Sequence, residues 1–215
     1  MTFAADRIAA ELGFRHFGMQ RLGANTHFPL LGFARSNPQY EHLWQVEFDV
    51  EYRGSWSDFF TTYAATDADL LGSHFHRWSD WPEWFWWSSL TYPQDLGIRQ
   101  EEFHKAFLPI MRLSRAAIAC VERAHRQGWM GHYEAIVPTV LLRDGHRIED
   151  LNARGNAYMG WFQDPVPLLP LLSTIRCRPP VGMHEFMSRG KGPLVFHPVK
   201  EAWTYDGERI VTWSK

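Results

Sequence analysis

Three short apolar segments are predicted to be buried strands, and they lie at residues 42–50, 68–75 and 107–114. The first of them, HLWQVEFDV, combines aromatic and β-branched residues, which favour strands. One helix is expected after Ser55 or Ser57, and another from Ser114 to about Arg126, because a serine hydroxyl caps a helix N-terminus. Strands that alternate with helices favour an α/β fold, so we expect an open, mixed and mainly parallel sheet with flanking helices.

The whole chain, residues 1–215, is expected to form a single domain. Its length and its 45% of hydrophobic residues are enough for one sizeable core, and no linker divides it. Residues 1–40 are the atypical part. A helix is expected over residues 3–12 with Gly13 as its end, and the stretch from there to Asn37 has no clear period and is expected to be a loop.

Composition excludes several classes of protein. The formal charge of -2 argues against a nucleic-acid partner, because no basic field is present to displace counterions from phosphates. No run approaches the roughly 18 apolar residues of a membrane span, and the N-terminus lacks the apolar core of a secretory signal. The two cysteines, Cys120 and Cys177, do not make a disulfide framework. We therefore expect a cytoplasmic protein.

Two acids close the first predicted strand. Alternation along a strand would place Glu47 and Asp49 on one face, about 7 Å apart. Two carboxylates at a strand end suit a hard divalent cation such as Mg²⁺ or Mn²⁺ that also binds phosphate oxygens. The alternative is a solvated strand end without a ligand.

A long loop, residues 76–98, holds much of the aromatic content of the chain. Long structured loops within compact domains are usually functional. Aromatic rings stack on sugars and nucleobases, and the interspersed polar residues favour a binding rim over packing on the core of the same chain. The five tryptophans of this loop are Trp78, Trp81, Trp84, Trp86 and Trp87.

Histidines form two further candidate sites. His74 and His76 end the second predicted strand and could bind a metal from one face, although loop histidines are more often merely solvated. The C-terminal third is rich in Pro and Gly, with short strands expected near 194–196 and 209–213. Between them His197 could supply a nitrogen ligand to a metal, and Lys200 could contact a phosphate.

Other charged residues lie within and after the third predicted strand. Glu134 could act as a general base, or it could be an acid favoured by the positive end of a helix. Its segment, 132–145, is expected to be partly helical with a break or kink at Pro138. Arg112 and Arg115 could bind a phosphate through two hydrogen bonds, or form surface ion pairs.

These motifs together resemble the later two-thirds of a glycosyltransferase of the GT-A type, the class that uses nucleotide-diphosphate sugars. The resemblance spans roughly residues 40–200 and lies in spaced short motifs. The family's first strand–turn unit, which holds the base of the donor, is missing or reduced in residues 1–40. The segments that carry the resemblance are WQVEFDVEYRGSW (44–56), DADLLGSH (67–74), FLPIMRLSRAAI (107–118), GHYEAIVPTVL (131–141) and FHPVK (196–200).

The resemblance implies a shortened GT-A-like fold and a role for each motif. Glu47-x-Asp49 matches the acidic metal-binding motif, with glutamate in place of the first aspartate, and His197 resembles the histidine that completes the metal shell. Glu134 resembles the catalytic base of inverting members. The implied partners are Mn²⁺ or Mg²⁺, a nucleotide-sugar donor and a carbohydrate or other hydroxyl acceptor. Phosphate contacts would come from Arg112, Arg115 and Lys200, and substrate contacts from His74 and the tryptophan loop.

Two other functions remain open from the sequence. One is a carbohydrate-binding domain without catalysis, which would keep the aromatic loop and lack the donor site. The other is a metal hydrolase that uses His74, His76 and a carboxylate.

Overall fold

The computed structural model describes residues 5–17, 24–152, 174–176, 180–188, 192–200, 202–205 and 210–214. The chain divides into two compact units. The first unit comprises Met1–Gln45 and Asp67–Asp150, and the second comprises Val46–Thr66 and Leu151–Lys215. The expectation of a single domain over residues 1–215 stays a prediction.

The first unit is built on an open four-stranded sheet with the order β1-β4-β3-β5. Strands β3 and β4 pair antiparallel, whereas β3 and β5 pair parallel, so the sheet is mixed. The expected predominance of parallel pairs is not found there, because the segment between β3 and β4 contains only short 3-10 turns and no crossover helix. The strands are β1 (His42–Val46), β3 (Leu70–Arg77), β4 (His104–Ser114) and β5 (Ile148–Asp150).

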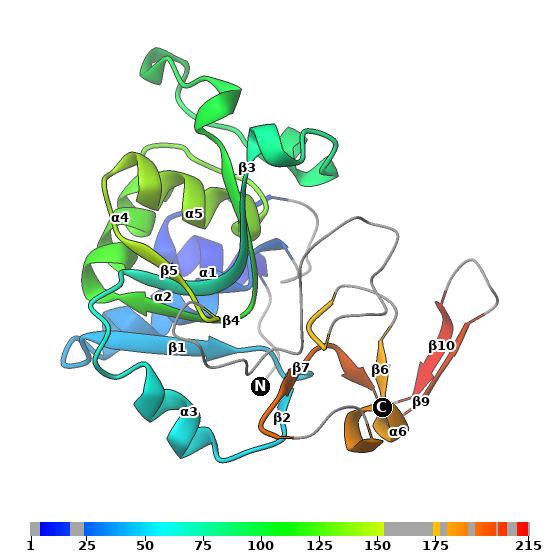
Figure 1. The fold of residues 1–215 in the computed structure, drawn as a ribbon. Coiled ribbons are helices and arrows are strands. Elements are labelled where there is room, and N and C mark those ends of the chain that lie inside the picture. Colours follow the sequence, from blue (N-terminus) through cyan, green and yellow to red (C-terminus); the bar gives the residue numbers. More distant parts are fainter. Residues whose placement is uncertain are drawn as a thin grey trace. The chain divides into compact units, whose positions relative to one another are not determined.

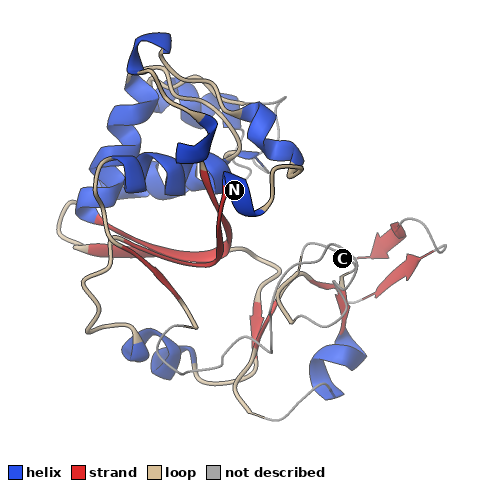
Figure 2. Cartoon of the chain, turned by 45° about the horizontal axis from the view of Figure 1, so that its top comes forward, coloured by secondary structure: helices blue, strands red, loops and turns tan. Residues whose placement is uncertain are grey.

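Four helices gather on one face of this sheet (Figures 1 and 2). Their buried apolar side chains and those of β4 form one continuous core, in which Leu108, Met111 and Leu113 of the strand are fully buried. The chain is therefore an α/β protein, as expected. The helices are α1 (Ala5–Leu12), α2 (His27–Ser36), α4 (Arg115–Arg126) and α5 (Tyr133–Arg143).

Helix α4 begins and ends where the sequence predicted. The Ser114 hydroxyl accepts a hydrogen bond from the Ala117 amide and so caps the first turn. At the other end Gly128 has a φ of +99°, a conformation that favours glycine, and the Trp129 amide bonds back to the carbonyl of Ala124. Helix α5 continues through Pro138, where a break or kink was expected.

The second unit contains short elements. Strand β2 (Glu51–Tyr52) pairs antiparallel with β7 (Val195–Phe196), and β6 (Val181–Gly182) pairs parallel with β8 (Val199–Lys200). The other elements are α3 (Trp56–Thr62), α6 (Met183–Ser188), β9 (Ala202–Tyr205) and β10 (Ile210–Ser214), of which β9 and β10 pair antiparallel. Strands β7 and β10 confirm the short strands expected near the C-terminus. Helix α3 was expected to begin after Ser55 or Ser57. The Ser55 hydroxyl caps it by accepting a hydrogen bond from the Asp58 amide.

Among the described residues, no helix is long and apolar enough to cross a membrane. Cys120 is a buried free cysteine, and Cys177 lies outside the described residues.

Candidate metal site

The acids Glu47 and Asp49 lie on a turn rather than on a strand. Strand β1 ends at Val46, four residues earlier than predicted, and the Val50 amide donates to the carbonyl of Glu47 at 3.0 Å. The turn brings the two carboxylates closer than the alternation of an extended strand would. The ring between them, Phe48, is 88% exposed.

His197 reaches this turn from the far end of the sequence. Strand β2, which follows the turn, pairs with β7, which precedes His197. The Val199 amide also donates to the carbonyl of Asp49 at 2.8 Å, and the His197 amide donates to the carbonyl of Thr174 at 2.8 Å. Backbone hydrogen bonds on both sides thus fix the position of the His197 ring, which is buried.

The three predicted metal ligands Glu47, Asp49 and His197 meet within the second unit. Nε2 of His197 lies 3.3 Å from Oε2 of Glu47 and 3.6 Å from Oδ1 of Asp49. One ligand atom from each residue lies within 4.8 Å of the other two. The predicted phosphate ligand Lys200 joins them, because its Nζ lies 2.7 Å from Oδ2 of Asp49.

The hydrogen bonding of His197 determines what its second nitrogen can do. Nδ1 lies 3.0 Å from the carbonyl oxygen of Arg176. Because a carbonyl can only accept, Nδ1 carries the hydrogen, and in the neutral ring Nε2 presents a lone pair toward the two carboxylates. Three acceptors facing one another require a proton or a cation between them.

The donor set fits a divalent cation. Oδ1 of Asp49 is buried and accepts no hydrogen bond from any residue that the structure describes. With neutral His197, the two carboxylates and the Lys200 ammonium carry formal charges of -1, -1 and +1, a sum of -1. Two carboxylates and one imidazole are ligands that divalent metal ions take in proteins, and a neutral imidazole that donates its other N–H to a carbonyl is the usual metal-bound form.

A partly buried ion pair supports the carbonyl that orients His197. The Arg176 guanidinium forms two parallel hydrogen bonds with Glu185 of α6, at 2.9 and 2.7 Å, and its side chain is only 3% exposed. The Arg176 amide also donates to the carbonyl of His197 at 3.0 Å. Arg176 and His197 therefore hold each other through reciprocal backbone and side-chain contacts.

The predicted catalytic base, Glu134, lies in the first unit in the first turn of α5. Its carboxylate is buried and accepts a hydrogen bond from the Leu108 amide of β4 at 3.2 Å. The neighbouring His132 caps the same helix, and burial lowers the pKa of His132 to about 4. These contacts are those of a structural carboxylate at a helix N-terminus, and the role of Glu134 as a base stays a prediction.

The two predicted phosphate-binding arginines hold backbone carbonyls of the first unit. Arg112 is buried and donates to the carbonyl of Ala68 at 2.9 Å. Arg115 donates to the carbonyl of Ala34 in the last turn of α2 and to the carbonyls of Asn37 and Tyr40, which come after this helix. Arg115 thus satisfies carbonyls that a helix end leaves without partners, a structural task that the sequence analysis did not consider.

The tryptophan loop packs inward. Trp84 and Trp87 are buried, and they form a cluster with Phe103, which precedes β4, and Ala135 of α5. The Lys105 ammonium lies 4.9 Å from the ring centre of Trp81 and 5.2 Å from that of Trp84, and Trp86 stacks on His132 at 4.4 Å. Trp78, Trp81 and Trp86 remain half-buried, so they keep some exposed surface for a ligand.

His74 lies at an irregular position of β3. Its φ is +53°, and the register of β3 against β4 shifts between Ser73 and His76, the interval in which it lies. Its Nδ1 lies 3.0 Å from the hydroxyl of Ser73, while its amide donates to Asp150 at 3.2 Å. In the described part of the chain, neither group of three potential metal ligands contains His74 or His76.

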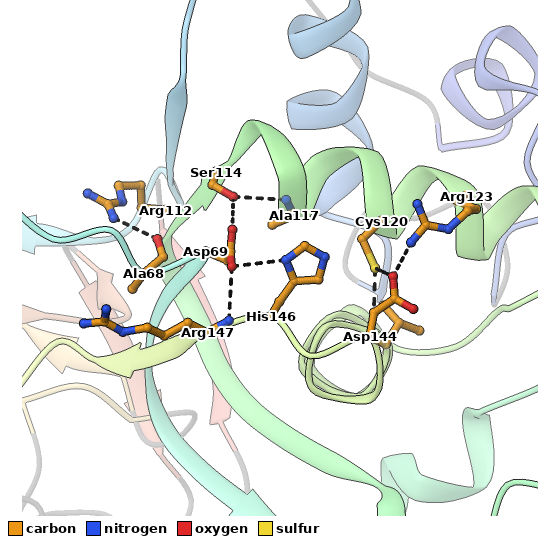
Figure 3. A network of polar contacts seen from close by, with 11 residues as sticks. Ala68, Asp69, Arg112, Ser114, Ala117, Cys120, Arg123, Asp144, His146 and Arg147 are labelled. Atoms are coloured by element: carbon orange, nitrogen blue, oxygen red, sulfur yellow. Dashed lines mark hydrogen bonds and ion pairs between the residues drawn. The ribbon is translucent and has the colours of Figure 1, made fainter.

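The other group of potential ligands was not predicted. It consists of Cys120, Asp144 and His146 in the first unit, next to a hydrogen-bond network around Asp69 (Figure 3). Asp144 and His146 lie more than 20 residues after Cys120 in the sequence, so no short motif joins the three residues. The fold brings them together, because α4 packs beside the end of α5.

Comparison with known proteins gives a single short match. A family model described as a protein of unknown function (DUF3405) matches residues 13–69, a stretch that includes Glu47 and Asp49 but not His197. No curated protein and no solved structure matches the chain.

Proposed function

We propose that this protein transfers a sugar from a nucleotide-diphosphate donor to a hydroxyl acceptor, with Mn²⁺ or Mg²⁺ bound by Glu47, Asp49 and His197. The observation that carries the proposal is the convergence of these three side chains, with a buried Asp49 oxygen that accepts no hydrogen bond from the described residues. The resemblance of the motifs to GT-A-type enzymes supplies the reaction class.

The charges of the site suit a diphosphate. A divalent cation bound there would neutralise charge on the leaving nucleotide diphosphate. Lys200, which forms an ion pair with Asp49, lies where its ammonium can contact a phosphate oxygen of a ligand bound at the same turn. The exposed ring of Phe48 lies 4.8 Å from that ammonium and offers an apolar surface beside the anionic one.

The proposal assigns no residue as the base that activates the acceptor. Glu134 was predicted for this role, but one of its carboxylate oxygens accepts the Leu108 amide in a buried environment. A general base has to reach the proton that it removes.

The test compares two aspartates of the second unit. Asp49→Asn removes the charge of the candidate ligand, while Asp58→Asn makes the same change at an exposed position of α3. We expect Asp49→Asn to lower the affinity for Mn²⁺ at least 100-fold and to abolish Mn²⁺-dependent hydrolysis or transfer from a panel of nucleotide sugars. Asp58→Asn should behave as the unmodified protein.

Three results decide between the functions. Turnover that needs Mn²⁺ and is lost in Asp49→Asn supports the transferase. Carbohydrate binding that survives both EDTA and Asp49→Asn supports the carbohydrate-binding alternative instead. If the unmodified protein neither binds Mn²⁺ nor any nucleotide sugar of the panel, the proposal is wrong.

A further inference from the structure

A second cluster of metal-ligating side chains lies in the first unit and shares no residue with the proposed site of Glu47, Asp49 and His197. Cys120 comes from the middle of α4, and Asp144 and His146 follow the end of α5. One ligand atom of each lies within 4.8 Å of the other two. We propose that Cys120, Asp144 and His146 form a Zn²⁺ site.

The chemistry of the three ligands selects the ion. A thiolate, a carboxylate and an imidazole are the donors that proteins use for Zn²⁺, whereas Mg²⁺ and Ca²⁺ take oxygen ligands. Tetrahedral Zn²⁺ with bonds of about 2.0–2.3 Å holds its ligand atoms about 3.3–3.8 Å apart. Sγ of Cys120 and Oδ2 of Asp144 are already 3.5 Å apart, so binding needs a closure of about 1.5 Å at most elsewhere in the cluster.

A second carboxylate orients the histidine. In Figure 3 the His146 ring lies between Asp69 on one side and Cys120 with Asp144 on the other. Nδ1 of His146 lies 3.1 Å from Oδ2 of Asp69, which leaves Nε2 as the nitrogen whose lone pair can bind an ion. Metal-binding histidines usually donate their other N–H to such a carboxylate, which fixes the ring and raises its basicity.

Asp69 is itself held in place. Its Oδ1 accepts the Ser114 hydroxyl at 2.5 Å and its Oδ2 accepts the Arg147 amide at 3.1 Å. These two hydrogen bonds fix the position of the carboxylate that orients His146, as the outer shell of a metal site requires.

Two hydrogen-bond donors compete with the ion for Asp144. The Cys120 thiol donates to Oδ2, and Arg123 forms an ion pair with the same oxygen. Binding of Zn²⁺ would replace the thiol proton, which passes to solvent, and would displace Arg123, whose side chain is 52% exposed. The half-exposed Asp144 gives the ion a route from solvent.

The experiment titrates the full chain with Zn²⁺ and, separately, with Co²⁺, whose bond to a thiolate gives a charge-transfer absorption. We expect one ion with thiolate absorption. Cys120→Ser should abolish that absorption, and His146→Gln should weaken Zn²⁺ binding at least 100-fold. Asp69→Asn should weaken it about 10-fold or more, the usual effect of losing an outer-shell partner.

Arg123→Gln gives the sharpest readout, because it changes an exposed side chain and leaves the three ligands intact. Loss of the competing guanidinium should tighten Zn²⁺ binding several-fold, which a purely structural ion pair would not do. Cys177→Ser and Asp49→Asn are controls that should leave the Co²⁺ absorption unchanged. The proposal is overturned if the unmodified protein gives no thiolate absorption, or if the absorption persists in Cys120→Ser.

Discussion

Asp49 in the second unit and Glu134 in the first unit show how differently two acids of similar sequence context can be used. The resemblance to GT-A-type enzymes implies that both belong to one catalytic site. Asp49 lies on a turn beside His197 and Lys200, with one buried oxygen that accepts no hydrogen bond from the described residues. Glu134 lies at the start of α5, where its carboxylate accepts the amide of Leu108.

The difference lies in what each carboxylate contacts. The oxygens of Asp49 face titratable and cationic side chains, and such a site can exchange a proton for a metal ion. Glu134 satisfies a buried backbone N–H, which costs free energy when it loses its partner. We therefore expect a substitution of Glu134 to lower the stability of the protein, and a substitution of Asp49 to weaken ligand binding.

The largest expected effect is the acid sensitivity of the first unit. Burial lowers the pKa of His125 and of His132 to about 4, and that of His27 well below its usual value. The unfolded chain then binds more protons than the folded one between pH 6.5 and about 4, so stability is full above pH 6.5 and falls on acidification. From pH 7 to pH 5 the free energy of unfolding should fall by about 2 kcal/mol for each of His125 and His132.

Urea unfolding followed by tryptophan fluorescence at several pH values checks this. His132→Gln should remove its share of the pH dependence, whereas the same change at the exposed His184 should leave the slope unchanged. A flat profile between pH 7 and pH 5 would contradict the neutral, buried histidines.

The next effect compares the two acids directly. Glu134→Ala should lower the free energy of unfolding by about 3 kcal/mol, because it leaves the Leu108 amide buried without its charged acceptor. Glu134→Gln keeps an acceptor for this amide and should lower the free energy of unfolding by only about 1 kcal/mol. Asp49→Ala should lower the free energy of unfolding less than Glu134→Ala does. It should lower the affinity for Mn²⁺ far more than Glu134→Ala does.

Denaturant unfolding and Mn²⁺ titration of the three variants give the answer. The comparison fails if Glu134→Ala leaves stability intact and lowers Mn²⁺ affinity as strongly as Asp49→Ala does. That outcome would place Glu134 in a metal or donor site after all.

Local signals in the sequence predicted local structure well. Ser114 and Gly128 bound α4 because capping and a positive φ are properties of single residues. Helix α2 was missed because its segment contains Pro29 and Gly32 and its cap residue, Thr26, makes no side-chain cap. Its buried positions at 27, 30, 31 and 34 nonetheless have helical spacing, so a periodicity count would have found it.

The site was predictable only in part, and for a physical reason. Glu47, Asp49 and His197 are residue types that metals require, so their chemistry pointed to them, although the turn at 47–50 was read as strand. The arginines and Glu134 have equally suggestive chemistry. Their use as partners of backbone groups depends on which carbonyls and amides the fold leaves unsatisfied, and no local pattern encodes that.

The smallest expected effect on stability concerns Phe48, and it sharpens the contrast between the units. Phe48→Ser should change the free energy of unfolding by less than about 0.5 kcal/mol, because the side chain is 88% exposed. Stacking of a base on an aromatic ring contributes about 1–3 kcal/mol, so the same change should weaken binding of a nucleotide sugar about 10-fold or more.

Phe85→Ser makes a matched change at an exposed ring of the first unit and should leave donor affinity unaltered. Isothermal titration of both variants in Mn²⁺ measures the difference. Equal donor affinity in Phe48→Ser and the unmodified protein would remove Phe48 from the donor site, and a loss shared by both variants would move the aromatic contact to the tryptophan loop.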